Sequence, residues 1–376
     1  MFGIYIHIPF CVKKCKYCDF NSFNMNLNEK KIYLEDLKKE IEMYSSDYKN
    51  KKIDTIFFGG GTPSILTSKE IEDLMRILKE KFNFSKEVEI TMECNPGTID
   101  REKLQTMKIN GINRLSIGLQ AVQNSHLKYI GRIHTYEEFE KNFKEARTIG
   151  FDNINIDLMF DLPNQTEDDW KESLKKVVKL NPEHISAYSL ILEEGTELFE
   201  MYNREEFSLM DENKDIDMYE YTINYLRENG YNQYEISNYA KKDKECKHNI
   251  IYWKCENYIG LGAGASGYLG KERYTNEMNL SDYHKKIYNN QKPIMSIEML
   301  SEEEMIEEKV FMNLRMNEGI NRKEFKEKFG IDFYEKYKNK IDTLKERNLL
   351  TIDDISIKLT QKGREISNNV FLEILS

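Results

Sequence analysis

Residues 5–20 read YIHIPFCVKKCKYCDF, an apolar stretch that leads directly into three closely spaced cysteines. Cys11, Cys15 and Cys18 follow the pattern CxxxCxxC. The apolar residues before them predict a buried strand, Gly3–Ile8, and the cysteines lie just beyond its carboxyl end. Functional side chains of parallel α/β barrels gather at this end of the strands.

Short apolar runs alternate with amphipathic helical stretches through most of the chain. Helix start signals separate the runs, such as the capping box that Thr67 and Glu70 would form. Repeated strand–helix units predict an α/β fold with a parallel sheet and right-handed crossovers, either an open sheet or a whole or partial barrel. The predicted strands are Gly3–Ile8, Asp54–Phe58, Val88–Met92, Arg114–Gly118, Asn153–Leu158 and His184–Leu190.

Composition excludes several classes of protein. The 376 residues include 55 Lys or Arg and 65 Asp or Glu, which gives a formal net charge of −10. This acidic balance argues against a general nucleic-acid binder. No apolar run approaches the ~18–20 residues of a membrane span, and no signal-peptide pattern follows Met1. We therefore expect a cytoplasmic protein with no nucleic-acid partner and no integral membrane segment.

The three clustered cysteines point to a metal group. Three thiolates on one tight loop can bind three irons of a cubane [4Fe–4S] cluster and leave the fourth iron without a protein ligand. A zinc site needs a fourth ligand and usually a second pair of cysteines, while a reducing compartment disfavours a disulfide. Three reduced cysteines without any metal are the plain alternative.

The CxxxCxxC pattern, with an aromatic residue just before its last cysteine, resembles the radical S-adenosylmethionine (SAM) superfamily. More narrowly, FFGGGTPSIL, MECNPG, GLQ…GRIH and IDLMFDLP occur in the order typical of the oxygen-independent coproporphyrinogen oxidase family, and the resemblance spans essentially the whole chain. It implies that Cys11, Cys15 and Cys18 hold a [4Fe–4S] cluster whose open iron is chelated by SAM. One electron would then cleave SAM to methionine and a 5′-deoxyadenosyl radical.

The resemblance also implies a SAM site. Glycines after the second strand would let the backbone approach the ligand closely, although a tight turn also favours glycine. Taken singly, each tyrosine is as well explained by packing as by contact with SAM, and each polar position is more often a surface or satisfied polar residue. As a set on successive strand ends, they point into one pocket. The positions that match the family's SAM site are Tyr5, Tyr17, Gly60, Gly61, Thr62, Glu93, Gln120, Arg132 and Asp157.

Two departures from the family pattern bear on function. The oxidases carry a further cysteine two residues after the third, where this chain has Phe20. The chain also starts only a few residues before its first strand, without the oxidases' N-terminal extension. Both features resemble the haem chaperones of the HemW type. Decarboxylation of coproporphyrinogen III is then the second hypothesis, and radical chemistry on another substrate is the third.

Residues 248–253 read HNIIYW, which matches the HNxxYW pattern proposed to bind haem in that subgroup. An imidazole can ligate iron, and an aromatic pair can cover a flat porphyrin. Cys246 and Cys255 could instead offer a thiolate. The alternative is a structural segment whose indole fills the core and whose imidazole bonds to the backbone. The candidate haem residues are His248, Asn249, Tyr252 and Trp253.

We therefore expect a haem chaperone that carries haem as cargo to haem-accepting proteins, respiratory proteins among them, with the cluster and SAM in a supporting role. The expected regions are a radical SAM core at 1–240, built as a (β/α)6 partial barrel of the TIM type, a connecting region with the HNxxYW motif at 241–296, and a C-terminal domain at 297–376. The last region has the helix and strand order of a small, mainly helical, winged-helix-like domain, and we expect it to serve as packing or as a lid.

A glycine-rich segment matches a dinucleotide-binding pattern without its structural context. Residues 262–267 read GAGASG and fit GxGxxG, the dinucleotide-binding pattern. That site requires a helix directly after the glycines, and the following YLGKERYTN does not predict one. We expect a close-packed turn here.

Overall fold

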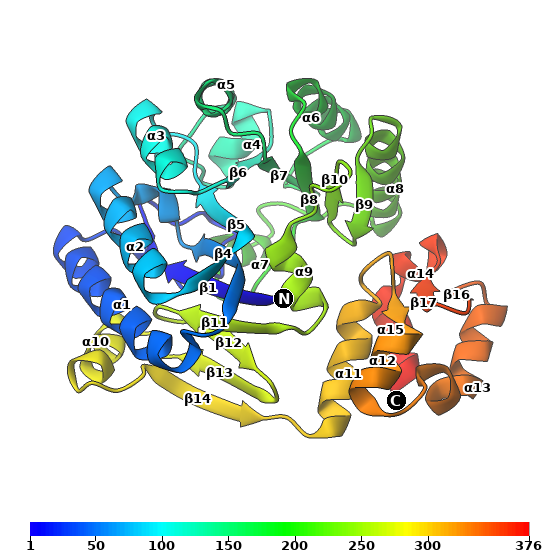
Figure 1. Cartoon of the computed structure of the whole chain (residues 1–376). Coiled ribbons are helices and arrows are strands. Elements are labelled where there is room, and N and C mark those ends of the chain that lie inside the picture. The colour runs from blue at the N-terminus through cyan, green and yellow to red at the C-terminus, as the bar shows by residue number, and fades with distance from the viewer. Residues whose placement is uncertain (376) are drawn as a thin grey trace.

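Six parallel strands form the centre of the sheet in the computed structural model, which describes residues 1–375 (Figure 1). They hydrogen-bond to one another in chain order, so the predicted (β/α)6 partial barrel is confirmed. Most of their residues are buried, as expected of strands covered on both faces, although residues 83–88 are partly or fully exposed. The six are β1 (Phe2–Ile8), β4 (Lys52–Gly60), β5 (Asn83–Cys94), β6 (Arg114–Gln120), β7 (Ile154–Phe160) and β8 (His184–Ser189).

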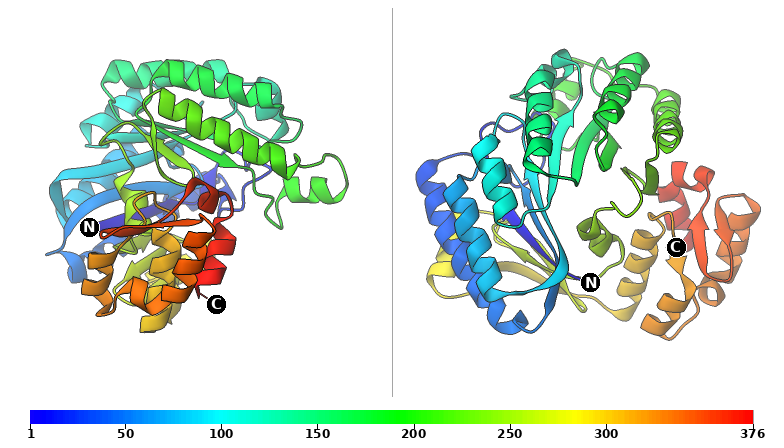
Figure 2. Two further views of the ribbon diagram at one scale, coloured as in Figure 1. Left: turned by 90° about the vertical axis from the view of Figure 1, so that its right-hand side faces the viewer. Right: turned by 45° about the horizontal axis from the view of Figure 1, so that its top comes forward.

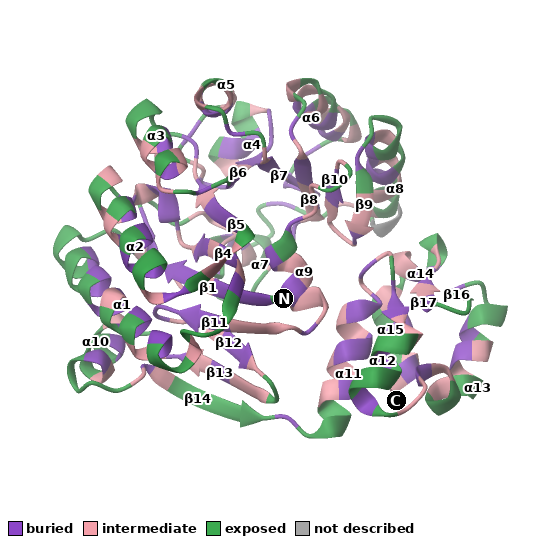
Figure 3. Ribbon diagram, in the orientation of Figure 1, coloured by how far each residue is buried: buried purple, intermediate pink, exposed green. Residues whose placement is uncertain are grey.

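Helices cover the outer face of these strands, and their buried residues face the sheet (Figures 2 and 3). The predicted capping box is present, because Glu70 N donates to Thr67 Oγ1 at 3.2 Å and Thr67 N donates to Glu70 Oε2 at 2.8 Å. The helices of this layer and its loops are α1 (Leu27–Tyr48), α2 (Ser68–Lys81), α3 (Arg101–Ile109), α4 (Asn124–Tyr129), α5 (Tyr136–Ile149), α6 (Glu167–Leu180), α7 (Glu197–Asn203) and α8 (Glu212–Glu228), with a 3-10 turn η1 at Pro63–Ile65.

The sheet continues beyond the barrel strands at both edges, which the sequence did not predict. One added strand runs parallel to β1, and the others pair antiparallel. These strands are short and partly polar, so they lack the apolar pattern of the central ones. They are β9 (Asn232–Glu235) and β10 (Asn238–Ala240) beside β8, and β11 (Asn257–Leu261), β12 (Ser266–Leu269), β13 (Glu272–Asn276) and β14 (Ile294–Met299) beside β1.

Residues 241–296, expected as a connecting region, thus contribute four strands to the barrel sheet. The same region contains α9 (Lys247–Trp253), which contacts β1 and β4, and α10 (Leu280–Tyr288), which packs on α1. Within the described part of the chain, no helix combines the length and apolar character that crossing a bilayer requires.

The C-terminal segment has its own hydrophobic core, which includes Val310, Phe325 and Ile357. It is mainly helical, as expected, and three short strands form a sheet of order β15–β17–β16. The elements are α11 (Glu302–Asn313), β15 (Ile320–Asn321), α12 (Arg322–Phe329), α13 (Phe333–Glu346), β16 (Leu350–Ile352), β17 (Ser356–Leu359), α14 (Gln361–Glu365) and α15 (Ser367–Leu375).

Side chains of α11 bind the carboxyl end of α9. Asn313 Nδ2 donates to Trp253 O at 2.6 Å, and Lys309 Nζ donates to Lys254 O at 2.6 Å. These carbonyls end a helix and have no partner within it, so the C-terminal segment supplies the cap that α9 lacks.

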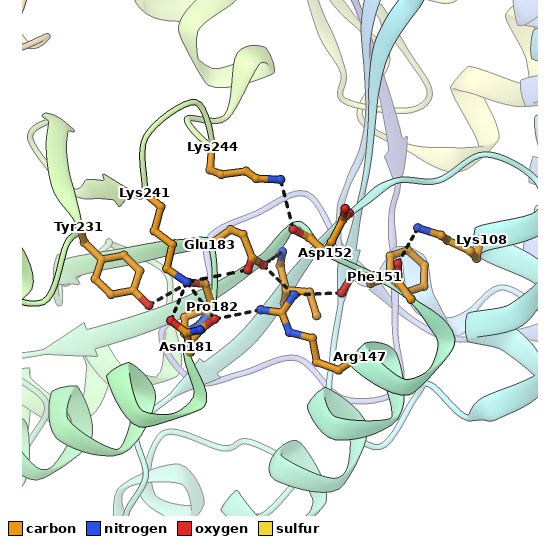
Figure 4. A network of polar contacts seen from close by, with 12 residues as sticks. Lys108, Arg147, Phe151, Asp152, Asn181, Pro182, Glu183, Tyr231, Lys241 and Lys244 are labelled. Carbon is orange, nitrogen blue, oxygen red and sulfur yellow. Dashed lines mark hydrogen bonds and ion pairs between the residues drawn. The ribbon is translucent and has the colours of Figure 1, made fainter.

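A polar network ties the barrel elements together near the amino end of β8 (Figure 4). Glu183 pairs with Arg147 Nη1 at 2.7 Å and with Lys241 Nζ at 3.9 Å. Arg147 Nη2 and Lys241 Nζ also donate to Asn181 O, at 3.1 and 3.2 Å. Asn181 caps α6 with a left-handed φ of 58°. Both cations therefore neutralise a helix C-terminus as well as one carboxylate.

Candidate cluster and cofactor site

A cavity of about 360 Å³ lies among the carboxyl-terminal halves of the barrel strands and the cysteine loop. All three cysteines line it, as do eight of the nine positions expected to contact SAM and one position of the HNxxYW motif. The structure thus brings together residues from seven separate parts of the chain. The predicted residues that line the cavity are Cys11, Cys15, Cys18, Tyr17, Gly60, Gly61, Thr62, Glu93, Gln120, Arg132, Asp157 and Asn249.

The cysteine loop is held at its base and at its tip. At the base, β2 (Phe10–Cys11) pairs with β3 (Phe23–Asn24). At the tip, Lys16 N donates to Ile130 O at 3.0 Å, and Leu198 N donates to Lys16 O at 2.8 Å. Backbone bonds to α4 and α7 therefore keep the loop over the cavity.

Each thiol has a hydrogen-bond donor beside it. Thr62 Oγ1 lies 3.4 Å from Cys11 Sγ, and Arg132 Nη1 lies 3.5 Å from Cys15 Sγ. The backbone N–H of Phe20 donates to the Cys18 thiol. Burial raises the pKa of Cys11 and raises that of Cys18 to about 11. Bound iron would reverse this shift, because a coordinating thiol is deprotonated.

The three thiols line one cavity. Among the residues that the structure describes, no three His, Cys, Asp or Glu side chains converge on one metal-ion position. The thiols of a cubane bind three different irons and need no such convergence.

Two glycines keep the cavity wall clear of side chains. Gly60 has a φ of +113°, and a Cβ there would lie 2.6 Å from the His7 ring. A Cβ on Gly61 would lie 2.8 Å from Phe10 O. Both positions need glycine on steric grounds, and they leave backbone groups open toward the cavity.

Two carboxylates lie on neighbouring parts of the wall. Burial, together with repulsion from Asp157, raises the pKa of Glu93 to about 8, although Gly60 N–H donates to this carboxylate and opposes the shift. Burial also raises the pKa of Asp157. Asn155 Nδ2 donates to Asp157 Oδ1 at 2.7 Å, and Ser116 Oγ lies 3.4 Å from Oδ2. Desolvated carboxylates of this kind are suited to accept hydrogen bonds from ligand hydroxyl or ammonium groups.

Several buried polar atoms in the wall have no protein partner. They include Gln120 Oε1, Arg132 Nε and Asn238 Oδ1. Gln120 also has a positive φ of 68°, at an irregularity in the pairing of β6 with β7. Strain and unsatisfied polar atoms cluster at ligand sites, so the residues present fit a polar ligand beside the cysteines.

Tyr17 and Tyr5, both expected at the SAM site, differ in position. Tyr17 lines the cavity and packs against the apolar cluster that contains Leu127 and Leu198. Tyr5 is not among the lining residues. Its hydroxyl lies 3.0 Å from His7 Nδ1, and its ring stacks on Phe57, which does line the cavity. Tyr5 therefore supports the wall from behind.

The HNxxYW motif forms α9, which packs inside the barrel beneath the cavity. His248 is fully buried, with Nδ1 2.7 Å from Thr55 Oγ1 and Nε2 2.8 Å from the Tyr252 hydroxyl. Burial, with a contribution from Arg114, lowers the pKa of His248 to about 3. Both ring nitrogens are engaged, so ligation of iron by His248 requires one of these bonds to break.

Asn249 and Trp253 of the HNxxYW motif lie in different surroundings. Asn249 lines the cavity, whereas Trp253 lies toward α11, with the Arg315 guanidinium 5.9 Å from its ring. Cys246 and Cys255, the alternative thiolate donors, are both buried.

Two protein-family models match parts of this chain. Residues 5–177 match the model of the radical SAM superfamily, and residues 300–366 match the HemN C-terminal domain. A Lactococcus lactis protein described as Heme chaperone HemW is 38% identical over 99% of this chain and 96% of its own length. A Bacillus subtilis protein of the same description is 36% identical over 99% and 98%.

The chain belongs to the HemW family of radical SAM proteins.

Membership of the radical SAM superfamily implies a [4Fe–4S] cluster and SAM. The fold also resembles a solved structure of coproporphyrinogen III oxidase (HemN) from Escherichia coli, with a TM-score of 0.86 and 24% identity over 100% of this chain and 90% of that one. This likeness confirms the expected architecture.

Sequence reasoning missed part of the wall of this HemW-family cavity. Arg114 begins β6 and is only 2% exposed, yet it lines the cavity with Nε unpartnered. A charged residue inside an apolar run was the available signal. The other missed polar residues are Lys13, Asn95, Ser116, Asn155, Ser186, Tyr188 and Asn238.

Proposed function

We propose that this protein is a cytoplasmic haem chaperone, which binds haem and delivers it to haem-requiring proteins, respiratory proteins among them. The observation that carries the proposal is similarity over 99% of the chain to two proteins described as Heme chaperone HemW. A match of this extent includes the barrel, α9 and the C-terminal segment. It therefore reaches beyond the radical SAM core that many unrelated activities share.

The residues around the cavity would hold the two cofactors. Cys11, Cys15 and Cys18 would bind the cluster, and Glu93 and Asp157 would accept hydrogen bonds from SAM. Gly60, Gly61 and Thr62 would admit its methionine end, Tyr17 would pack on its adenine, and Gln120 and Arg132 would complete the polar wall. When bound, the cluster and SAM supply one-electron chemistry and a source of the 5′-deoxyadenosyl radical.

Phe20 favours the chaperone over the decarboxylase. Its side chain lines the cavity and is 61% exposed. A phenyl ring offers a flat apolar surface beside the cluster loop, where the oxidases carry a thiol. Such a surface suits contact with an aromatic macrocycle.

The HNxxYW residues are proposed as haem contacts that become available through a change in α9. His248 would have to exchange its bond to Tyr252 or Thr55 for a bond to iron. Tyr252 and Trp253 would then offer aromatic contacts, and Asn249 would join this site to the cavity.

The test is an anaerobic assay of the reconstituted protein with SAM, reductant and coproporphyrinogen III, with porphyrins resolved by chromatography, followed by haem titration of the same preparation. We expect no protoporphyrinogen and stoichiometric haem uptake by protein that carries a full cluster. Accumulation of protoporphyrinogen would make the protein the decarboxylase. If the protein neither forms protoporphyrinogen nor takes up haem, the third hypothesis, radical chemistry on another substrate, becomes the favoured one.

A further inference from the structure

The GAGASG segment, which the proposed function leaves unexplained, is the turn between β11 and β12. Gly262 and Gly264 have φ values of +102° and +78°, and Ala263 and Ala265 are buried. A strand follows the turn, so no helix N-terminus is available for a dinucleotide phosphate. The expected close-packed turn is confirmed.

This turn holds the end of the cysteine loop through one side chain. Asn21 Nδ2 donates to Ala263 O at 3.2 Å and to Met278 O at 3.0 Å. A Cβ added to Gly264 would overlap the Asn21 amide. The glycine therefore makes room for Asn21, which lies 242 positions earlier in the chain than Ala263.

The backbone of Asn21 is held from the opposite side. His7 Nε2 lies 2.8 Å from Asn21 O, and since a carbonyl can only accept, this nitrogen carries the proton. His7 Nδ1 is then the acceptor for the Tyr5 hydroxyl, 3.0 Å away. Asn21 is thus fixed by β1 through its carbonyl and by the turn through its amide.

The turn that grips Asn21 is itself anchored to α1. Gly262 N donates to Glu40 Oε2 at 2.7 Å, and Tyr283 Oη donates to the same oxygen at 2.6 Å. Ala263 N donates to Tyr33 Oη at 3.2 Å, and Tyr33 Oη donates to His7 O at 2.6 Å. Glu40 is fully buried. A turn with this many buried contacts is a rigid support.

We propose that Asn21 is a positioning residue that fastens the end of the cysteine loop to the GAGASG turn and so keeps the cluster in place. Asn21 follows Phe20, whose N–H donates to the Cys18 thiol. Release of Asn21 would free this donor and the segment that carries the third ligand. The proposal rests on cluster binding by the three cysteines and is independent of haem transfer.

The first test removes the hydrogen-bond donor of Asn21 in two ways. Asn21→Asp removes the amide protons and places a carboxylate against two carbonyl oxygens, while Asn21→Ala removes the side chain. Each protein is reconstituted anaerobically, its iron and sulfide are counted, and the loss of visible absorbance in excess chelator is timed. We expect both variants to lose the cluster about tenfold faster, the effect of one or two lost hydrogen bonds.

The second test uses a matched pair of glycines. Gly264 and Gly270 have φ values of +78° and +71°, but a Cβ on Gly270 meets nothing within 4 Å. Gly264→Ala and Gly270→Ala therefore impose similar backbone strain, and only the former displaces Asn21. We expect faster cluster loss in Gly264→Ala alone. Trypsin cleavage of the cluster-free proteins after Lys13, Lys14 or Lys16 should accelerate in the same variant, which reports loop mobility without any cofactor.

The two tests distinguish failure of this proposal from failure of the cysteine assignment. Wild-type half-lives for the cluster in both Asn21 variants would overturn the proposal. Equal effects of Gly264→Ala and Gly270→Ala would also overturn it, because backbone strain alone would then explain the loss. Failure of the wild-type protein to bind any cluster would instead refute the assignment of the cysteines on which the proposal rests.

Discussion

The guanidinium of Arg132 lies against the thiol of Cys15, with Nη1 3.5 Å from Sγ. Its Nη2 donates to Gly118 O at 2.6 Å and to the side chain of Asn95. One partly buried cation thus joins the cysteine loop to the carboxyl ends of β5 and β6. A cation in this position would stabilise negative charge on the cluster, which gives Arg132 a measurable effect on redox potential.

Arg132→Met should lower the reduction potential of the cluster, because methionine keeps much of the volume and removes the charged donor to Cys15. Hydrogen bonds to the sulfurs raise cluster potentials. A charge-assisted hydrogen bond corresponds to a shift of about 60 to 120 mV for one electron. An EPR-monitored redox titration measures it, with the exposed Arg76→Met as control. An unchanged potential with a full cluster would contradict this role.

Cys15→Ala should abolish cluster binding, since two thiolates would remain where three are needed. Iron and sulfide analysis and visible absorbance after anaerobic reconstitution provide the measurement. Cys255→Ala is the control, because Cys255 is buried and does not line the cavity. Full iron and sulfide content in Cys15→Ala would refute the ligand assignment.

Glu93→Gln should change how stability depends on pH. The unfolded carboxyl loses its proton near pH 4.5, whereas the folded one, with a pKa of about 8, keeps it longer. Between pH 4.5 and 8, the Glu93 carboxyl is therefore protonated in the folded state and ionised in the unfolded state. The free energy of unfolding that Glu93 contributes is lost as pH rises from about 4.5 to 8.

Glutamine has no proton to lose, so the free energy of unfolding of Glu93→Gln should fall less over this window. The difference in slope should reach at most about 1.4 kcal/mol per pH unit. Urea unfolding of the cluster-free proteins at pH 5, 6.5 and 8 measures it, with the exposed Glu80→Gln as control. Parallel pH profiles for wild type and Glu93→Gln would show that Glu93 does not titrate in this range.

Tyr252→Phe and His248→Ala should have opposite effects on haem affinity. Tyr252→Phe removes the hydroxyl that lies 2.8 Å from His248 Nε2 and so releases a nitrogen for iron. We expect haem to bind about tenfold more tightly to this variant, as one hydrogen bond no longer competes, and more weakly to His248→Ala. Haem titration followed by its Soret band gives both affinities.

Cluster content should be unchanged in both variants, because neither residue touches the cysteine loop. His284→Ala, at a partly exposed position of α10, controls for the loss of a histidine. If the wild-type protein and all three variants bind haem with equal affinity, α9 has only a structural role.

The order of the barrel strands and the set of residues at their carboxyl ends were predictable from local sequence. A buried parallel strand needs a continuous apolar run, and a capping box needs two residues three positions apart, so both leave a readable pattern. The added edge strands were not predictable, because a strand such as β14, which is mostly exposed, carries no such run.

The sequence by itself determined the spacing of Cys11, Cys15 and Cys18 and the alternation of strands and helices that builds the barrel. Both of these depend on neighbours a few positions apart. Tertiary structure alone decided that Asn21 meets Ala263, that Arg132 meets Cys15, and that His248 is buried with both nitrogens engaged. These contacts join residues more than a hundred positions apart or depend on which face of a helix is buried, so they exist only once the packing of the sheet has placed their partners together.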